Sequence, residues 1–391
     1  MSQAALVPKL RFSEFSDDWE EKRFVDITTK ISDGIHSTPN YDEGGTYSFV
    51  NGNNLVNGVI KINSQTKKVD ENEYTTHQRP LGSNTILISI NGTIGNLALY
   101  NNEKVVLGKS ACYLNINEKD TDKLYVFNLL RTCKIKRFFN SELTGSTIKN
   151  LSLTTIKNTK LNLPTKPEQQ KIAAFLTAVD TKIEQLSKKQ ELLGEYKKGS
   201  MQQIFSQAIR FKADDGSEFP DWEEKKLGGV GRIRKGSQLN KSELTDTGDY
   251  PAINGGINPS GYTDKWNTGK NTITISEGGN SCGYINFITS KFWSGGHCYS
   301  IEELKGDVLN RFLFQYLKFN EHLIMRLRVG SGLPNIQKGE INNFKVNLPS
   351  LEEQTKIANL LSSIDSKIEQ VGKQLRESKQ FKKALLQQMF V

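Results

Sequence analysis

One long segment occurs twice in this sequence, and the repetition limits the possible folds more than any other feature. Residues 162–205 align without a gap to residues 347–390, and roughly half of the aligned positions are identical. The shorter motif DWEEK begins at Asp18 and again at Asp221. The chain is therefore a tandem duplication, in which similar ends enclose middles that differ in sequence.

The repeated segments have the spacing of a coiled coil. Their apolar residues alternate in steps of four and three, which places them on one stripe of a helix. Each segment begins near a proline, and Glu168 and Glu352 suit the positive N-terminus of a helix. At 1.5 Å per residue, about 36 residues give a helix of about 54 Å, which must bury its stripe against a partner. We predict that the copies pack together through Ile172, Leu176, Val179, Ile183, Leu186, Ile357, Leu361, Ile364, Ile368, Val371 and Leu375.

The middles of the two copies have the patterns of mixed α/β domains. Residues 84–90 (NTILISI) and 271–277 (NTITISE) are predicted to be strands. Residues 124–139 and 309–327 have the period of amphipathic helices. The two middles therefore share an architecture although they do not share a sequence.

These patterns together predict an α+β fold built as a pseudo-twofold tandem duplication. Two mixed α/β domains are separated by two long helices, which pack as an antiparallel coiled coil. We place the mixed domains at residues 1–150 and 209–346, and the helical regions at residues 151–208 and 347–391.

Composition narrows the class of protein. The chain has 391 residues and a net charge of +9, and it is long enough for two or three domains. A basic chain suits an acidic partner such as nucleic acid, although charge alone does not prove one. No run of 18 apolar residues occurs, and the first residues lack the pattern of a secretory signal. We expect a cytoplasmic protein without a membrane span.

The cysteines and histidines do not have the spacing of a metal or redox site. Cys112, Cys133, Cys282 and Cys298 form no C-x-x-C pair, so we predict reduced thiols. The four histidines are scattered along the chain. We therefore predict no metal site and no catalytic cysteine pair.

Motifs of nucleotide-dependent enzymes are also missing from the sequence. It contains neither the glycine-rich loop of nucleoside triphosphatases nor the glycine fingerprint of dinucleotide or methyl-donor sites. The acidic residues of DWEEK are too close together in sequence to converge on a metal from separate strands. Trp19 and Trp222 are better explained as anchors for the start of each copy. We predict a non-catalytic chain that needs no cofactor of its own.

Polar, glycine-rich loops interrupt both middles, for example at residues 32–45, 49–58 and 253–269. They are rich in Asn, Ser, Gln, Lys and Arg, which are the side chains that contact base edges and phosphates. Any single Asn-Gly pair is adequately explained as a turn. The loops taken together favour DNA binding.

Several of these motifs also resemble a known family. They are WEEKRF and WEEKKL, the loop SDGIHSTPNY, and the two exits that begin GSTIKNL and GSGLPNI and lead into the repeated helices. The chain resembles the specificity subunit of Type I restriction-modification enzymes, in which two variable target-recognition domains alternate with two conserved helical regions. The first exit departs from this pattern, because it has STIKNL where the second has the more usual SGLPNI.

This resemblance implies that each variable domain binds one half-site of an asymmetric, bipartite DNA target with an unread spacer. The helices would then set the spacing between the half-sites. A strut of about 54 Å suits half-sites about one to one and a half helical turns apart. The candidate DNA-binding residues are Lys30, Ser32, His36, Thr38, Asn51, Asn53, Asn54, Arg232, Arg234, Lys235, Ser237, Gln238, Asn254, Tyr262, Arg326 and Arg328. The basic residues of GRIRKGS fit either phosphate contacts or solvated charges.

The resemblance also implies the partners. They are double-stranded DNA, two methyltransferase (modification) subunits that hold the helical regions, and restriction/translocase subunits. Methyl donor, ATP and magnesium would bind to those subunits and not to this chain. Two other functions fit the sequence: a scaffold whose duplicated domains bind protein or glycan, and a nuclease with an unrecognised site. Salt-dependent DNA binding argues against the scaffold, and a test for magnesium-dependent cleavage decides on the nuclease.

Overall fold

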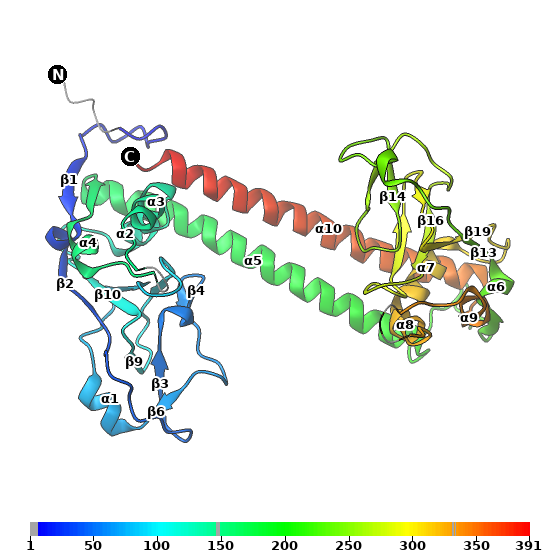
Figure 1. The fold of residues 1–391 in the computed structure, drawn as a ribbon, viewed down its shortest axis with the longest axis horizontal. Helices are drawn as coiled ribbons and strands as arrows, with labels where there is room; N and C mark the ends of the chain where they lie inside the picture. Colours follow the sequence, from blue (N-terminus) through cyan, green and yellow to red (C-terminus); the bar gives the residue numbers. More distant parts are fainter. Residues whose placement is uncertain (1–6, 146–148, 331, 333) are drawn as a thin grey trace. The chain divides into compact units, whose positions relative to one another are not determined.

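The computed structural model describes residues 7–145, 149–330, 332 and 334–391. The chain forms two compact units (Figure 1). Unit 1 comprises Met1–Ser187 with Lys373–Val391, and unit 2 comprises Lys188–Gly372. No helix in the described ranges is long and apolar enough to cross a membrane.

Unit 1 is built around an antiparallel sheet with the strand order β2-β10-β7-β8. A second sheet has the order β6-β3-β9, in which β3 and β9 are parallel. Two-stranded sheets join β1 to β11 and β4 to β5. The bounds are β1 Glu20–Arg23, β2 Thr28–Asp33, β3 Tyr47–Val50, β4 Leu55–Val56, β5 Val59–Ile60, β6 Lys68–Val69, β7 Thr85–Ser89, β8 Leu97–Leu99, β9 Val105–Leu107, β10 Ala111–Ile116 and β11 Lys160–Leu163. The helices are α1 Glu71–His77, α2 Lys123–Leu130, α3 Cys133–Ser141 and α4 Leu153–Asn158.

Both faces of the four-stranded sheet of unit 1 are covered. Side chains alternate along a strand, so neighbours on β7 enter different cores. Ile86 and Ile88 pack in one core with Tyr125 and Leu129 of α2. Leu87 packs in another core with residues of the second sheet. The strand β7 lies within the strand predicted at residues 84–90. This two-sided burial explains why it carries apolar side chains on both faces.

Unit 2 repeats this topology. Its four-stranded sheet has the order β13-β19-β16-β17, its mixed sheet has the order β15-β14-β18, and β12 pairs with β20. The bounds are β12 Glu223–Lys226, β13 Arg232–Lys235, β14 Tyr250–Ile253, β15 Gly261–Thr263, β16 Thr272–Ser276, β17 Ile285–Ile288, β18 Trp293–Ser294, β19 Cys298–Glu302 and β20 Lys345–Leu348. The helices are α6 Leu227–Val230, α7 Asn310–Phe319, α8 Glu321–Arg326 and α9 Lys338–Asn343.

The repeated motif DWEEK has a structural role in each unit. Its last three residues, Glu-Glu-Lys, lie on β1 and β12, which pair antiparallel with β11 and β20 just before the long helices. Trp19 is buried against Tyr125, and Trp222 packs edge-on against Phe312. Through this strand pairing, the motif joins the start of each copy to the strand that precedes its long helix.

The long helices are α5 Lys166–Phe205 and α10 Leu351–Gln388, drawn in green and red in Figure 1. In unit 1 the start of α5 packs with the end of α10, since Ile172 and Leu176 share a core with Leu385 and Met389. Unit 2 contains the reverse arrangement, in which the end of α5 packs with the start of α10. The helices are thus packed together antiparallel, as predicted.

The helix contacts in the two units are reciprocal. Asp180 forms an ion pair with Lys382 in unit 1, and Asp365 pairs with Lys197 at 2.7 Å in unit 2. Asp365 and Lys382 are the equivalents of Asp180 and Lys197 in the repeat. Each unit therefore joins an aspartate of one copy to a lysine of the other copy, which is the pattern of an isologous interface.

The predicted helices at 124–139 and 309–327 are each divided in two. The hydroxyl of Thr132 accepts the N–H of Ile135, which starts α3 after α2 has ended. Asn320 separates α7 from α8. Amphipathic periodicity continues across both breaks, so it did not reveal these changes of direction.

Candidate nucleic-acid interface

Several of the candidate DNA-binding residues gather at one end of the four-stranded sheet in each unit. In unit 1 this is where β2 and β7 end and β10 begins, because Asp33 faces Cys112 and Ser89 faces Ala111. In unit 2 it is the equivalent end of β13, β16 and β19. We call this end of each sheet the loop edge.

A glycine shapes the loop edge in both units. The N–H of Gly34 donates to Ala111, and that of Gly236 donates to Cys298. A Cβ on Gly34 would lie 2.0 Å from the carbonyl oxygen of Leu107, and one on Gly236 would lie 2.3 Å from backbone oxygen atoms. Any side chain would collide there with backbone. The glycines therefore allow the chain to cross the sheet end closely and to present the polar residues that follow.

The loop edge of unit 1 holds His36 and Asn51. Nε2 of His36 lies 2.9 Å from Oδ2 of Asp33. Oδ1 of Asn51 accepts a hydrogen bond from the hydroxyl of Ser110, and that hydroxyl accepts the N–H of Gly52. These bonds fix the orientation of Asn51 before any ligand binds.

Asn51, Asn53 and Asn54 also line a hollow of about 370 Å³ in unit 1. Tyr41 and Lys67 line it as well, and Nζ of Lys67 lies 4.1 Å from the centre of the Tyr41 ring. The other lining residues are Phe49, Lys61, Asn63, Gln65 and Thr66. Amides, an aromatic ring and lysines in one hollow are the groups that bind base edges and phosphates.

The loop edge of unit 2 holds Lys235, Gln238 and Asn254. Oδ1 of Asn254 accepts the N–H of His297 at 3.0 Å. The Oε1 atom of Gln238 would lie 2.8 Å from a Cβ on Gly296, so it is next to the same turn. Ser237 donates its N–H to the carbonyl of Ser294 and lies between Lys235 and Gln238.

A buried carboxylate organises this edge. Glu277 is 6% exposed; its Oε1 accepts from Nζ of Lys235 at 2.6 Å and from the hydroxyl of Tyr299 at 2.9 Å. Oε2 faces Nδ1 of His297 at 3.3 Å. Burial alone would raise the pKa of Glu277, but the hydrogen bonds from Lys235 and Tyr299 lower it below its ordinary value. Glu277 therefore stays ionised beneath the side chains of Lys235 and His297, which are both exposed to solvent.

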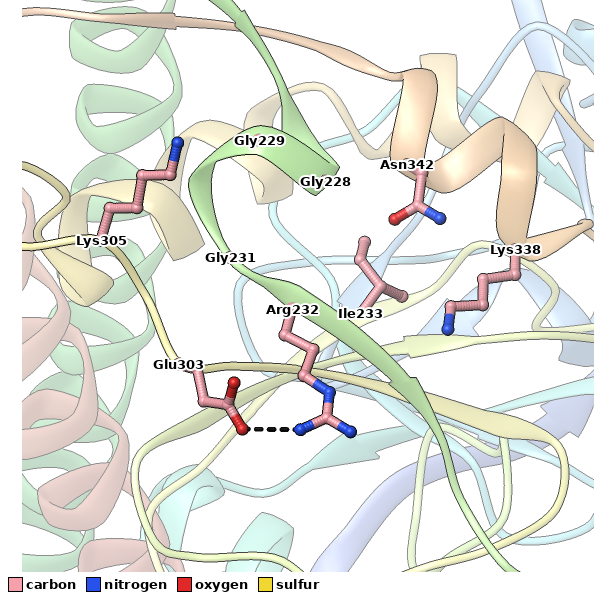
Figure 2. A pocket seen from close by; sticks show the side chains of 9 residues that line it. All are labelled: Gly228, Gly229, Gly231, Arg232, Ile233, Glu303, Lys305, Lys338 and Asn342. Atoms are coloured by element: carbon pink, nitrogen blue, oxygen red, sulfur yellow. Dashed lines mark hydrogen bonds and ion pairs between the residues drawn. The ribbon is translucent and has the colours of Figure 1, made fainter.

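Two of the candidate residues lie away from the loop edge along their strands. Lys30 faces Asn115 and Arg232 faces Glu302, both toward the opposite end of their sheets. Arg232 pairs with Glu303 at 2.8 Å beside a hollow of about 320 Å³ that Lys305 and Lys338 also line (Figure 2).

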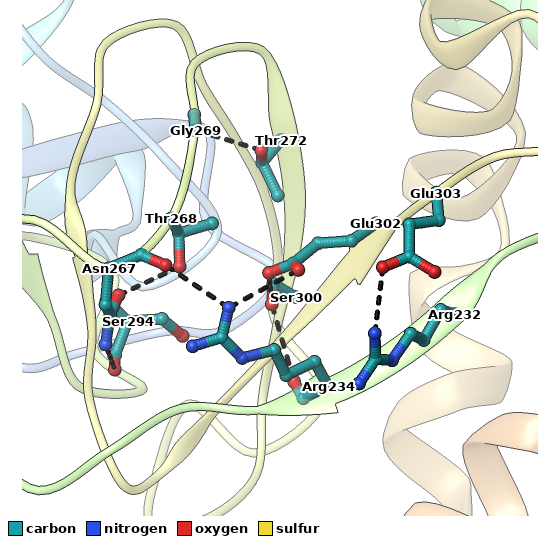
Figure 3. Close-up of polar contacts among 10 residues, drawn as sticks. All are labelled: Arg232, Arg234, Asn267, Thr268, Gly269, Thr272, Ser294, Ser300, Glu302 and Glu303. Atoms are coloured by element: carbon teal, nitrogen blue, oxygen red, sulfur yellow. Dashed lines mark hydrogen bonds and ion pairs between the residues drawn. The ribbon is translucent and has the colours of Figure 1, made fainter.

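Arg234 is also held by the protein itself. It donates to the backbone oxygen of Asn267 and lies 3.5 Å from Glu302 (Figure 3). Its position next to Asn267 makes it a support for the loop that follows β15. Arg232 and Arg234 are thus paired within the protein, an arrangement that neither explanation offered for the GRIRKGS cations, phosphate contacts or solvated charges, had included.

The remaining candidates are spread around the two units. Ser32 faces Tyr113 within β2, and Thr38 is exposed after His36. Tyr262 lies on β15 opposite Pro251. Arg326 ends α8 and Arg328 follows it, and both are exposed.

Glu277, His297 and the aromatic side of the unit 1 hollow were not among the residues predicted from the sequence. A shared pattern, Tyr-x-x-[Val/Ile]-Asn-Gly, marks the site in both middles: it runs from Tyr47 to Gly52 and from Tyr250 to Gly255. These stretches are as far apart as the two DWEEK motifs. The pattern identifies Asn51 and Asn254 as equivalents, whereas nothing local in the sequence joins Glu277 to Lys235.

The predicted seam residues of α5 and α10 are all buried or partly buried. Val179, Ile183 and Ile368 are partly buried. The buried ones are Ile172, Leu176, Leu186, Ile357, Leu361, Ile364, Val371 and Leu375.

The N-terminal end of each long helix also carries an ion pair that the heptad pattern did not reveal. Arg11 forms a bidentate ion pair with buried Glu168, and Arg210 does the same with Glu353.

The cysteines are free thiols. Burial raises the pKa of Cys112 and raises that of Cys298 to about 11, which leaves both protonated and unreactive near neutral pH. In the parts of the chain that the structure describes, no three His, Cys, Asp or Glu residues are grouped as a metal would require.

Comparisons with known proteins agree on one family. The model described as "Type I restriction modification DNA specificity domain" matches residues 16–193 and 220–377. A putative Type I restriction enzyme MjaX specificity subunit from Methanocaldococcus jannaschii is 28% identical over 97% of this chain and 94% of its own length. The MjaVIII specificity subunit of the same organism is 27% identical over 95% and 91%.

Solved structures agree on the fold. The crystal structure of a Type I restriction-modification S subunit from M. genitalium superposes with a TM-score of 0.70, at 21% identity and 99% coverage of both chains. A chain from a study of assembly and conformational transition in a Type I system gives a TM-score of 0.52, at 17% identity, with 95% and 97% coverage. At these identities the structural likeness supports the fold alone.

Proposed function

Since this chain belongs to the specificity subunits of Type I restriction-modification systems, we propose that it binds an asymmetric, bipartite DNA target with one half-site per unit. A specificity subunit is not itself an enzyme. Its task is target recognition within the restriction-modification complex.

The observation that supports this proposal is that both units have the same backbone frame at the loop edge but present different side chains there. Both units have the same sheet order, the same close glycine and the same Asn-Gly at the loop edge. Around that frame, unit 1 presents Asp33 and His36, whereas unit 2 presents Lys235 and Gln238. Equivalent frames suit equivalent placement on DNA, and different side chains recognise different bases.

The candidate residues divide by role under this proposal. Asn51 and Asn254 are rigid amides suited to adenine, which offers a donor and an acceptor in the major groove. Lys61, Lys67 and Lys235 suit guanine or phosphate. We keep the remaining candidates of the loop edges as DNA contacts, and we assign Arg232 and Arg234 to internal support.

Exchanging residues 25–150 for the first variable domain of another specificity subunit should change one half-site and leave the other intact. The reason is that each frame lies within its own unit and is closed by its own strand pair, β1–β11 or β12–β20. The measurement is the set of modified sites in cells that carry the chimera with its modification subunit. If both half-sites change together, independent recognition is wrong.

The same proposal assigns partners. Two modification subunits bring the methyl donor, and restriction/translocase subunits bring ATP and magnesium. Two identical partners need two equivalent docking surfaces, and each copy of the repeated helix can supply one of them. Tyr196 is 59% exposed in unit 2, and its equivalent Phe381 is 52% exposed in unit 1. An exposed aromatic at a repeated position suits an interface anchor.

Replacing Tyr196 and Phe381 by alanine should release the modification subunits. Each single variant is expected to weaken one docking site by about 2 kcal/mol or more, and the double variant both sites. Light scattering of the reconstituted complex gives the stoichiometry. Leu323→Ala is the control, since Leu323 is an exposed apolar residue of α8 outside the repeated helices. Full occupancy in the double variant would exclude these anchors.

A further inference from the structure

The second half-site surface contains a group that the candidate list did not include. His297 is 64% exposed, although it lies between the buried Glu277 and Asn254. Two hydrogen bonds hold the backbone of His297 in place. The N–H donates to the side chain of Asn254 at 3.0 Å, and the carbonyl accepts the N–H of Glu277 at 2.9 Å.

The ring of His297 is oriented as well. Oε2 of Glu277 is buried and has no hydrogen bond within the described residues. Nδ1 of His297 approaches this oxygen to 3.3 Å. A buried carboxylate oxygen without a partner is costly, so it favours the ring position in which Nδ1–H points inward. That position leaves Nε2 of the imidazole for a ligand.

We propose that His297 and Lys235 form a two-pronged DNA contact in unit 2, held in place by Glu277. The proposal rests on the proposed function and adds a specificity residue to it. Glu277 is a positioning residue, because its two oxygen atoms hold the two prongs and its own side chain is buried.

The two prongs suit different atoms of DNA, because Lys235 donates hydrogen bonds and Nε2 of His297 accepts one. The ammonium of Lys235 is half exposed and keeps two N–H donors beyond the one directed at Glu277. These donors suit guanine O6 or N7 or a phosphate oxygen. An imidazole with Nδ1–H turned inward presents Nε2 as an acceptor, which suits the amino group of cytosine N4 or adenine N6. Gln238 and Asn254 flank the pair and supply amides to neighbouring positions.

The equivalent place in unit 1 carries the opposite charge. Lys235 faces Tyr299 at the position where Asp33 faces Cys112, and Asp33 holds His36 directly. The contact of His297 and Lys235 is therefore specific to the second half-site. A variant in unit 2 thus has an internal reference, namely the first half-site of the same DNA.

The test uses the complete complex of this chain with its modification subunit. Wild type, His297→Ala, His297→Gln and the control His322→Ala are compared by mapping modified sites in genomic DNA. Binding to a duplex with the wild-type motif is then measured over a range of salt concentrations. His322 is exposed at the start of α8, outside the loop edge.

If the contact is to a base, His297→Ala should relax one position of the second half-site, with about 5-fold or greater loss of discrimination there. An unchanged motif with a salt dependence lower by about one charge would instead indicate a charged ring against a phosphate, and it would overturn the base contact. His297→Gln should restore part of the discrimination, because its amide oxygen can accept a hydrogen bond as Nε2 does. Glu277→Gln should weaken the same position less than His297→Ala does.

The inference is overturned if His297→Ala matches His322→Ala in motif, affinity and salt dependence. A loss of both half-sites would also overturn it, because it would indicate damage to the fold and not to a contact. Failure of the proposed function is separate: the wild-type complex would then show no bipartite motif at all.

Discussion

Replacing Glu353 with alanine should destabilise unit 2 by about 3 to 5 kcal/mol, the usual cost of breaking a buried ion pair. The side chain of Glu353 is fully buried. Its Oε2 accepts from Nη2 of Arg210 at 2.8 Å and from Nε1 of Trp222 at 3.2 Å. Arginine keeps its proton at neutral pH, so the guanidinium cannot relieve the loss by deprotonating. The variant leaves the indole N–H without its acceptor, and Arg210 keeps only the backbone oxygens of Phe219 and Pro220 and a 3.6 Å approach to Asp221.

Urea unfolding followed by tryptophan fluorescence measures this effect. Glu191→Ala is the matched control, because Glu191 pairs with Lys188 on an exposed stretch of α5 and should show no measurable change. Glu168→Ala should give a similar loss in unit 1, where Arg11 takes the place of Arg210. Equal stability of Glu353→Ala and Glu191→Ala would show that the pair contributes nothing.

Lengthening both long helices by four residues should widen the unread spacer of the DNA target by about one or two base pairs. The insertions are made after Ser187 in α5 and after Gly372 in α10, where each helix passes from one unit into the other. Four residues add about 6 Å to a helix and turn it by only about 40°, so the apolar seam stays nearly in phase. One base pair occupies about 3.4 Å of duplex. Both half-sites should persist.

Inserting two residues at the same places is the control. It turns each downstream helix by about 200°, which moves the apolar stripe into water, so the complex should fail to assemble. Modified sites are mapped for both variants with the modification subunit present. A folded and active four-residue variant with an unchanged spacer would mean that the helices do not set the distance.

The duplication, the long helices and the tryptophan anchors could be predicted because their evidence is local or repeated. A heptad is legible within one segment, and its recurrence at equivalent positions indicates that the two segments pack together. Trp19 and Trp222 were expected as anchors for the same reason, and both pack against aromatic residues of their units. The division of residues 124–139 and 309–327 was not foreseen. A single cap residue such as Thr132 ends one helix and starts another without disturbing the apolar period.

The sequence by itself determined the two copies, the paired helices, the family and the kind of residue that we propose to contact DNA. Only the tertiary structure decided which of those residues meet. Lys235, Glu277 and His297 come from β13 and from the two loops at the ends of β16 and β19, and strand pairing brings them to one edge. The same pairing carries Lys30 and Arg232 toward the other end. The physical reason is that side-chain type is a local property, whereas the register between strands depends on the packing of the whole unit.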